Sequence, residues 1–237
     1  MTHTNHTHTK DNTFMLTYSG HKFYPWHPEE SEICIDDIAH ALSNICRFGG
    51  HSYRHFSVAE HSLGVEWLVR KYQSMCKGGN SVKSKKVRLF ALMHDAAEAY
   101  LGDISTPIKQ FIPEFKIMEN KIQRAIEDRL CEGVKSKNDK EFIKNCDVES
   151  VVGEADSVMN YSCGMLAHFT PDGYGMSKQD ENMYTRKWET FSNYGASSEF
   201  ASFNDNINDA FAKTYYKLKL DITKNEAYRA GSLWGCK

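Results

Sequence analysis

Ionisable residues lie on a helical stripe that should face the protein core. The stripe consists of Val87, Ala91, His94, Glu98 and Leu101. Steps of four and three residues place all of these on one face of a helix. An unpaired imidazole or carboxylate in an apolar interior is costly, so such groups are normally paired or bound to a ligand. The pattern therefore predicts a buried site for chemistry and not only a hydrophobic core.

Ionisable residues also lie on the apolar face of two further predicted helices. His61 lies on the apolar seam of the preceding helix, and Asp95 directly follows His94. The seam of a later helix consists of Ile143, Asp147, Ser150 and Glu154. A single buried histidine is usually a hydrogen-bonded core residue, and a buried aspartate is often a cap or an ion-pair partner. Two imidazoles and two carboxylates together form a mixed N/O ligand set that suits one divalent metal ion.

The hydrophobic periodicity predicts an all-α fold. Residues 18–32 are aromatic, contain proline and lack a helical period, so they predict an extended segment or hairpin. Residues 1–13 are expected to be a disordered tail, and 14–237 a single domain, since no repeat or boundary is visible. Helices are expected over about 36–48, 57–76, 87–101, 114–131, 139–160, 181–193 and 205–222.

Composition and charge exclude several classes of protein. The 237 residues carry 29 Lys and Arg against 31 Asp and Glu, and a net charge of −2 argues against a nucleic-acid partner. No run approaches the ~18 apolar residues of a membrane span, and no signal peptide is evident. The seven cysteines include no CxxC pair, and their odd number argues against a closed disulfide framework. A soluble, cytoplasmic protein with reduced thiols and no membrane or stable nucleic-acid partner is expected.

The order of the ionisable residues resembles a known family. His61, then His94-Asp95, then Asp147 follows the H…HD…D order of the HD-domain metal-dependent phosphohydrolases. The run HDAAEAYLGDISTPIKQF (94–111) is similar to that of the YfbR-type 5′-deoxynucleotidases. Upstream, RFGGHSYRHFSVAEH (47–61) is similar to their Arg-aromatic segment and first histidine. Phage dATP triphosphohydrolases share the same constellation, and the resemblance covers about residues 18–160.

The resemblance implies an HD-domain helical bundle with a metal site between helices. Its core would span about 18–160, and a C-terminal helical extension would span about 162–230. The residues implied as ligands of one divalent ion (Mn, Co, Zn or Mg) are His61, His94, Asp95 and Asp147. Such an ion lowers the pKa of bound water and screens phosphoryl charge.

Two carboxylates are implied to do the proton transfers. Glu98 matches the acid that orients or deprotonates the attacking water, and Asp103 matches an acid that assists the leaving oxygen. A structural ion pair of Glu98 with Arg88 or Lys109 remains an alternative. Asp103 could equally be a carboxylate at a helix end or turn.

Substrate contacts are implied near both motifs. Arg47 resembles the phosphate clamp of the family, because guanidinium offers a planar fork of donors. Lys109 is a second phosphate candidate, with an ordinary surface lysine as the alternative. Phe48 and His51 are candidates for base or sugar contacts, although either could serve in packing. Phe48 departs from the tryptophan that the family often has after its arginine.

The implied reaction is hydrolysis of a 2′-deoxynucleotide at the α-phosphorus next to the 5′ oxygen. A deoxynucleoside monophosphate would give deoxynucleoside and phosphate. A deoxynucleoside triphosphate would give deoxynucleoside and inorganic triphosphate. The motifs do not separate these substrates. Alternatives are a catalytically silent HD module that binds nucleotide or metal as a regulator, a helical nucleic-acid-binding protein, and an HD enzyme for another substrate. The expected partner is the small-molecule deoxynucleotide, and a homo-oligomer is expected.

Overall fold

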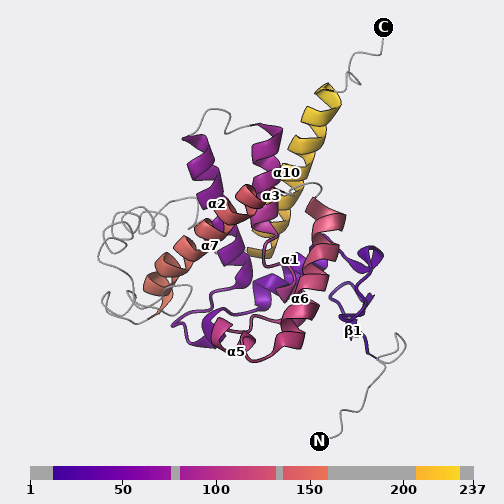
Figure 1. Ribbon diagram of the computed structural model, residues 1–237, viewed down its shortest axis with the longest axis vertical. Coiled ribbons are helices and arrows are strands. Elements are labelled where there is room, and N and C mark those ends of the chain that lie inside the picture. Colours follow the sequence, from indigo (N-terminus) through magenta and orange to yellow (C-terminus); the bar gives the residue numbers. More distant parts are fainter. Residues whose placement is uncertain (1–12, 76–80, 132–135, 160–206, 230–237) are drawn as a thin grey trace, which may run out of the picture.

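The computed structural model describes residues 13–75, 81–131, 136–159 and 207–229 (Figure 1). Within these ranges the regular elements are helices, apart from an antiparallel hairpin of β1 (Met15–Leu16) and β2 (Lys22–Phe23). The prediction of an all-α fold is confirmed. The longer helices are α1 (Ile35–Asn44), α2 (Val58–Ser74), α3 (Val82–Leu92), α6 (Pro113–Ile126), α7 (Lys137–Val158) and α10 (Ile207–Arg229). The short ones are α4 (Glu98–Leu101) and α5 (Thr106–Lys109), with 3-10 turns at Glu30–Glu32 and Phe48–Gly50 and a π-helical turn at Glu127–Cys131.

Several predictions fall outside these ranges or stay untested. The expected tail up to residue 12, the helix expected at 181–193 and most of the C-terminal extension lie outside the described residues. The single domain, the homo-oligomer and the cytoplasmic location stay predictions. None of the helices in the described ranges combines the length and apolar character needed to cross a bilayer.

A capping box fixes where α2 begins. The Ser57 hydroxyl accepts a hydrogen bond from the Glu60 amide at 3.1 Å, and the Glu60 carboxylate accepts one from the Ser57 amide at 2.8 Å. These two bonds satisfy amide groups that a helix start leaves without partners. His61 follows in the first turn, so the cap also fixes the position of the His61 side chain along the helix axis.

The continuous helix expected over 87–101 is wrong. Helix α3 ends at Leu92, residues 93–97 form turns, and α4 begins at Glu98. The side chain of Gln123 on α6 stabilises this break: it accepts from the Ala97 amide at 3.1 Å and donates to the Met93 carbonyl at 2.9 Å. Backbone groups that a helix would pair are satisfied by this one amide side chain. The predicted stop at Gly102, which has φ +79°, is confirmed.

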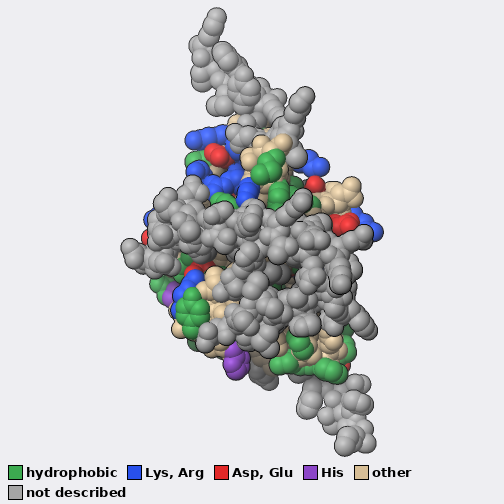
Figure 2. Space-filling view, turned by 90° about the vertical axis from the view of Figure 1, so that its left-hand side faces the viewer, with side chains coloured by type: hydrophobic (Ala, Val, Ile, Leu, Met, Phe, Trp, Pro, Cys, Tyr) green, Lys and Arg blue, Asp and Glu red, His purple; other side chains and the backbone are tan. Residues whose placement is uncertain are grey.

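One buried cluster joins both ends of the described chain. Helix α10 packs along α3 and α1, while α7 crosses α2 (Figure 1). Four side chains of α10 belong to the same core as those of α1, α2 and α3. They are Phe211, Tyr215, Leu218 and Ile222. Two ion pairs also join α3 to α10. Nζ of Lys85 lies 3.3 Å from Oδ2 of Asp221, and Nζ of Lys86 lies 2.6 Å from Oε1 of Glu226. Figure 2 shows basic and acidic side chains mixed in this way toward the upper end of one face.

A smaller cluster holds the loop before α2 against the end of α7. Phe56 packs with Ala155, Val158 and Met159, and Phe48 packs onto this group. The Tyr53 amide also donates to the Val158 carbonyl at 2.9 Å. The loop that carries Arg47 is therefore fixed to the same helix that carries Asp147.

Candidate metal and active site

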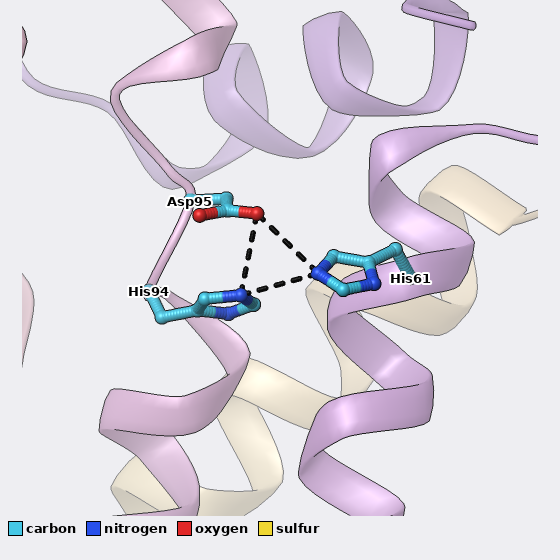
Figure 3. Close-up of side chains that lie close together, drawn as sticks. All are labelled: His61, His94 and Asp95. Carbon is cyan, nitrogen blue, oxygen red and sulfur yellow. Dashed lines mark hydrogen bonds and ion pairs between the residues drawn. The ribbon is translucent and has the colours of Figure 1, made fainter. Parts of the chain in front are cut away.

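Four ionisable side chains from three segments converge between α2, the 93–97 turns and α7. The Nε2 atoms of His61 and His94 lie 3.2 Å apart. Oδ2 of Asp95 lies 3.4 Å from the first of these atoms and 3.2 Å from the second, as Figure 3 shows. Oδ1 of Asp147 lies 3.2 Å from His61 Nε2 and 3.7 Å from His94 Nε2. The structure thus brings together all four residues that the sequence indicated as ligands.

The other ring nitrogen of each histidine faces a hydrogen-bond acceptor. His61 Nδ1 lies 2.7 Å from Oε1 of Glu154, and His94 Nδ1 lies 2.8 Å from the carbonyl of Ala91. A carbonyl or an ionised carboxylate can only accept, so each Nδ1 carries the proton. In its neutral form, which is the form that binds a metal ion, each ring therefore directs the lone pair of Nε2 into the four-residue cluster.

The cluster fits a divalent metal ion. Ligand atoms about 2.0–2.2 Å from a common ion at tetrahedral or octahedral angles lie roughly 3.0–3.4 Å from one another. Most of the separations above fall in or close to that range, and three of the residues form a compact possible metal-binding group, His61, His94 and Asp95. Imidazole with carboxylate is a donor set suited to several first-row metals.

The charges in the cluster favour a bound cation. Burial opposes protonation of His94, but the nearby charges of Asp95 and Asp147 outweigh it and raise the pKa of this ring to about 9. Burial also opposes ionisation of Asp147, yet its hydrogen bonds to His61 and His94 hold the pKa of this carboxyl well below its usual range. Burial likewise opposes ionisation of Asp95, but the charge of His94 and hydrogen bonds to both rings hold the pKa of this carboxyl well below its usual range. Both carboxylates therefore remain ionised at neutral pH and attract positive charge to this point.

Glu98 lies next to the cluster at the start of α4 and is buried. Burial, followed by the charges of Asp95 and Asp103, raises the pKa of its carboxyl to about 8, against the opposing charges of Lys109 and Arg47. Its Oε2 atom is buried and has no hydrogen-bond partner among the residues that the structure describes. One carboxylate oxygen is thus available to a substrate or a water.

The structure distinguishes the two ion pairs considered for Glu98. Arg88 instead pairs with Glu66, with Nε of the arginine 2.6 Å from Oε1. The amine of Lys109 does lie 3.2 Å from Oε1 of Glu98, and it also donates to Glu119 at 2.7 Å. Lys109 is therefore half-buried between two carboxylates and is not an isolated surface lysine.

Arg47 borders the cluster on the side of the loop before α2. Its Nε lies 3.4 Å from Oε2 of Glu154, and its terminal nitrogen lies 3.9 Å from Oδ2 of Asp95. Burial opposes the charge of the guanidinium, but Glu154 and Asp95 outweigh it and raise the pKa further. Arg47 is thus a fixed positive charge beside the proposed ion site.

The remaining site candidates are Asp103, Phe48 and His51. Asp103 is half-buried, and its charge contributes to raising the pKa of both Arg47 and Glu98, which places it within electrostatic reach of them. The centroid of the Phe48 ring lies 5.7 Å from the guanidinium carbon of Arg47, and the backbone of Phe48 has φ +56°. His51 is exposed.

Sequence reasoning missed three residues that shape the site. Lys144 donates to Oδ2 of Asp147 at 2.7 Å, and the spacing i, i+3 on one helix was the available signal. Glu154 lies on the predicted seam of α7, but the sequence indicates no partner for it. Gln123 carried no signal, because its two backbone partners become available only when the helix breaks at residues 93–97.

A comparison with known families decides the classification. A family model described as "5′-deoxynucleotidase YfbR-like" matches residues 37–165, more than half of the chain. The chain belongs to this YfbR-like family. The matched region contains the four-residue cluster, Glu98 and Asp103. The recognition of an HD-type hydrolase from the sequence is confirmed by this match.

Individual relatives of this YfbR-like chain include two uncharacterised proteins and one named as a 5′-deoxynucleotidase. The uncharacterised protein YfdR of Escherichia coli K12 is 39% identical over 117 residues, which are 49% of this chain and 58% of YfdR. The uncharacterised protein RCAP_rcc00048 of Rhodobacter capsulatus is 33% identical over 148 residues, 61% of this chain and 72% of that protein. A 5′-deoxynucleotidase of Vibrio cholerae is 31% identical over 114 residues, 44% and 59% of the two chains. The chain thus spans less than two thirds of YfdR and of the Vibrio enzyme.

One solved structure is distantly similar. It is the cyanophage S-2L HD phosphohydrolase DatZ bound to dA and one catalytic Zn²⁺ ion. The likeness covers 79% of this chain and 95% of DatZ, with 21% identity and a TM-score of 0.42.

Proposed function

We propose that this YfbR-like chain is a metal-dependent phosphohydrolase that cleaves 2′-deoxynucleotide 5′-phosphates at the α-phosphorus. The observation that carries the proposal is the convergence of His61, His94, Asp95 and Asp147, in which two imidazole Nε2 atoms face each other at 3.2 Å. The family and the Vibrio cholerae 5′-deoxynucleotidase support the substrate class.

The four side chains of the cluster would hold one divalent ion, with Mn, Co, Zn and Mg as candidates. Such an ion supplies Lewis acidity, which lowers the pKa of a water and offsets negative charge on phosphoryl oxygens. The Nδ1 hydrogen bonds of both histidines keep Nε2 available for this role.

Glu98 and Asp103 would carry the two proton transfers. In the hydrolysis a water oxygen bonds to the phosphorus and the bond from phosphorus to the 5′ oxygen breaks. Glu98 takes a proton from the attacking water, since its buried Oε2 has no partner in the described residues. Asp103, in electrostatic reach of Glu98, gives a proton to the leaving 5′ oxygen.

Arg47 and Lys109 would bind the phosphate from two sides. Arg47 is buried and held at Asp95 and Glu154, so its guanidinium loses little conformational freedom on binding an anion. Lys109 brings a positive charge to Glu98 at 3.2 Å. Phe48 and His51 remain proposed contacts of the base or the sugar.

A product assay tests this function. Purified protein, stripped of metal and reloaded with Mn²⁺, Co²⁺, Zn²⁺ or Mg²⁺, is incubated with each dNMP and dNTP and with the matching ribonucleotides. Release of phosphate identifies a monophosphate substrate, and release of tripolyphosphate identifies a triphosphate substrate. Asp147→Asn serves as the inactive control.

Two results would contradict the proposal. A folded, metal-loaded protein that releases neither product from any deoxynucleotide lacks the activity. Tight nucleotide binding without any product would favour the alternative of a catalytically silent regulatory module.

A further inference from the structure

Glu154 is a buried carboxylate that contacts two parts of the site at once. It lies on α7 on the same seam as Asp147, and its side chain is 3% exposed. Its Oε1 atom lies 2.7 Å from Nδ1 of His61 on α2, and its Oε2 atom lies 3.4 Å from Nε of Arg47 in the preceding loop. A carboxylate buried to this degree persists only where its neighbours compensate its charge.

The contact with His61 determines which ring nitrogen carries the proton. An ionised carboxylate accepts, so Nδ1 is the protonated nitrogen and Nε2 presents a lone pair to the cluster. Ser150 reinforces this arrangement: its hydroxyl lies 3.2 Å from the same Nδ1 and donates its own proton to the Asp147 carbonyl at 2.7 Å. If the proton sat on Nε2 instead, His61 could not bind a metal ion through the nitrogen that faces the cluster.

The contact with Arg47 ties the proposed phosphate clamp to the same carboxylate. Both Arg47 Nε and Glu154 Oε2 are buried without a hydrogen bond in the described structure, so charge holds this pair at 3.4 Å. The far end of the guanidinium lies 3.9 Å from Oδ2 of Asp95. Arg47 thus lies between Glu154 and one of the proposed metal ligands.

We propose that Glu154 is a positioning residue that keeps His61 in its metal-binding orientation and keeps Arg47 beside the ion. The inference rests on the proposed function, because it assigns a role at the same site. Removal of an acceptor behind a metal-binding histidine commonly weakens metal affinity by about 10–100-fold.

Metal affinity, measured with Zn²⁺ or Co²⁺ against a competing chromophoric chelator, tests the proposal without any need for turnover. Glu154→Ala should weaken binding by at least about 10-fold. Glu154→Gln keeps an acceptor for Nδ1 and should weaken binding less than Glu154→Ala. The matched control is Glu149→Ala, because Glu149 is buried on the same helix but pairs with the Tyr72 hydroxyl at 2.6 Å. This control should bind metal as the native chain does.

A smaller loss in Glu154→Ala than about 10-fold, or an equal loss in Glu149→Ala, would overturn the proposal. The protonation of His61 in the metal-bound native chain gives a second test that needs no variant: nitrogen NMR should find the proton on Nδ1, and a proton on Nε2 would overturn the proposal. The proposed function is tested separately, since a chain that binds metal in this way but releases no product would contradict the activity alone.

Discussion

The amine of Lys109 lies 3.2 Å from Oε1 of Glu98, so the carboxylate proposed to accept a proton is also the partner in an ion pair. The pair is shared, because Glu119 accepts from the same amine at 2.7 Å. The second oxygen of Glu98 has no hydrogen-bond partner in the part of the chain described here. A structural role and a catalytic role are therefore both compatible with this geometry, and they predict different kinetics.

Glu98→Gln should lower kcat by about 10²–10⁴-fold, the usual contribution of general acid–base catalysis. The amide fills the same space and resembles the protonated acid, which predominates near neutral pH because the pKa is raised to about 8. Product release and thermal unfolding of the same preparation provide the measurement. Glu119→Gln is the control, since it removes the other partner of Lys109 and should change kcat only slightly. Equal losses of kcat in both variants would mean that the ion pairs of Lys109, and not proton transfer by Glu98, determine the rate.

The rate should also depend on pH through Glu98. A base must be ionised, so kcat/KM should fall as the pH drops through the pKa of Glu98, which burial and then the charges of Asp95 and Asp103 raise to about 8. A cation in the cluster offsets the effect of Asp95, so the acidic limb should lie at or below that value.

The charge of Lys109 lowers the pKa of Glu98. Lys109→Met should therefore move the acidic limb of the kcat/KM profile to higher pH. The exposed Lys83 offers a matched control, and Lys83→Met should leave the profile where it is. A limb that stays in place or moves to lower pH in Lys109→Met would exclude Glu98 as its origin.

Gln123 should stabilise the turns that carry His94 and Asp95. Gln123→Met removes the hydrogen bonds to the Ala97 amide and the Met93 carbonyl, which should cost about 1–3 kcal/mol of unfolding free energy. Urea unfolding of the metal-free chain measures this loss. Glu114→Gln, an exposed change on the same helix, should stay within about 0.5 kcal/mol of the native chain. A Gln123→Met chain as stable as the native one would show that the break at 93–97 does not depend on this side chain.

The sequence predicted which side chains converge better than it predicted the backbone that holds them. His61 and Asp147 could be located because a polar residue on an apolar seam is a local anomaly. The expectation that His94 and Glu98 share one continuous helix was wrong, because the break depends on Gln123, which approaches from α6. The pairing of Glu154 with His61 could not be predicted either, since it joins residues 93 positions apart. Periodicity reports which side of a helix is buried, whereas partners across helices depend on the packing of the whole chain.

Helix α10 should be an integral part of the core that supports the site. Phe211 is fully buried in the cluster that includes α1, α2 and α3, so Phe211→Ala should cost about 3–5 kcal/mol. Leu220 on the same helix is 53% exposed, and Leu220→Ala should have a small effect. Chemical denaturation of both variants provides the comparison. A Phe211→Ala chain with native stability would mean that residues 207–229 contribute little to this core.

The most direct test is anomalous diffraction from crystals of the chain grown with Co²⁺ or Zn²⁺, recorded at the absorption edge of the metal. One strong peak should lie about 2.0–2.2 Å from ligand atoms of His61, His94, Asp95 and Asp147. A metal-loaded crystal with no peak there, or with a peak bound by only part of this set, would contradict the assignment of these four residues to a single ion.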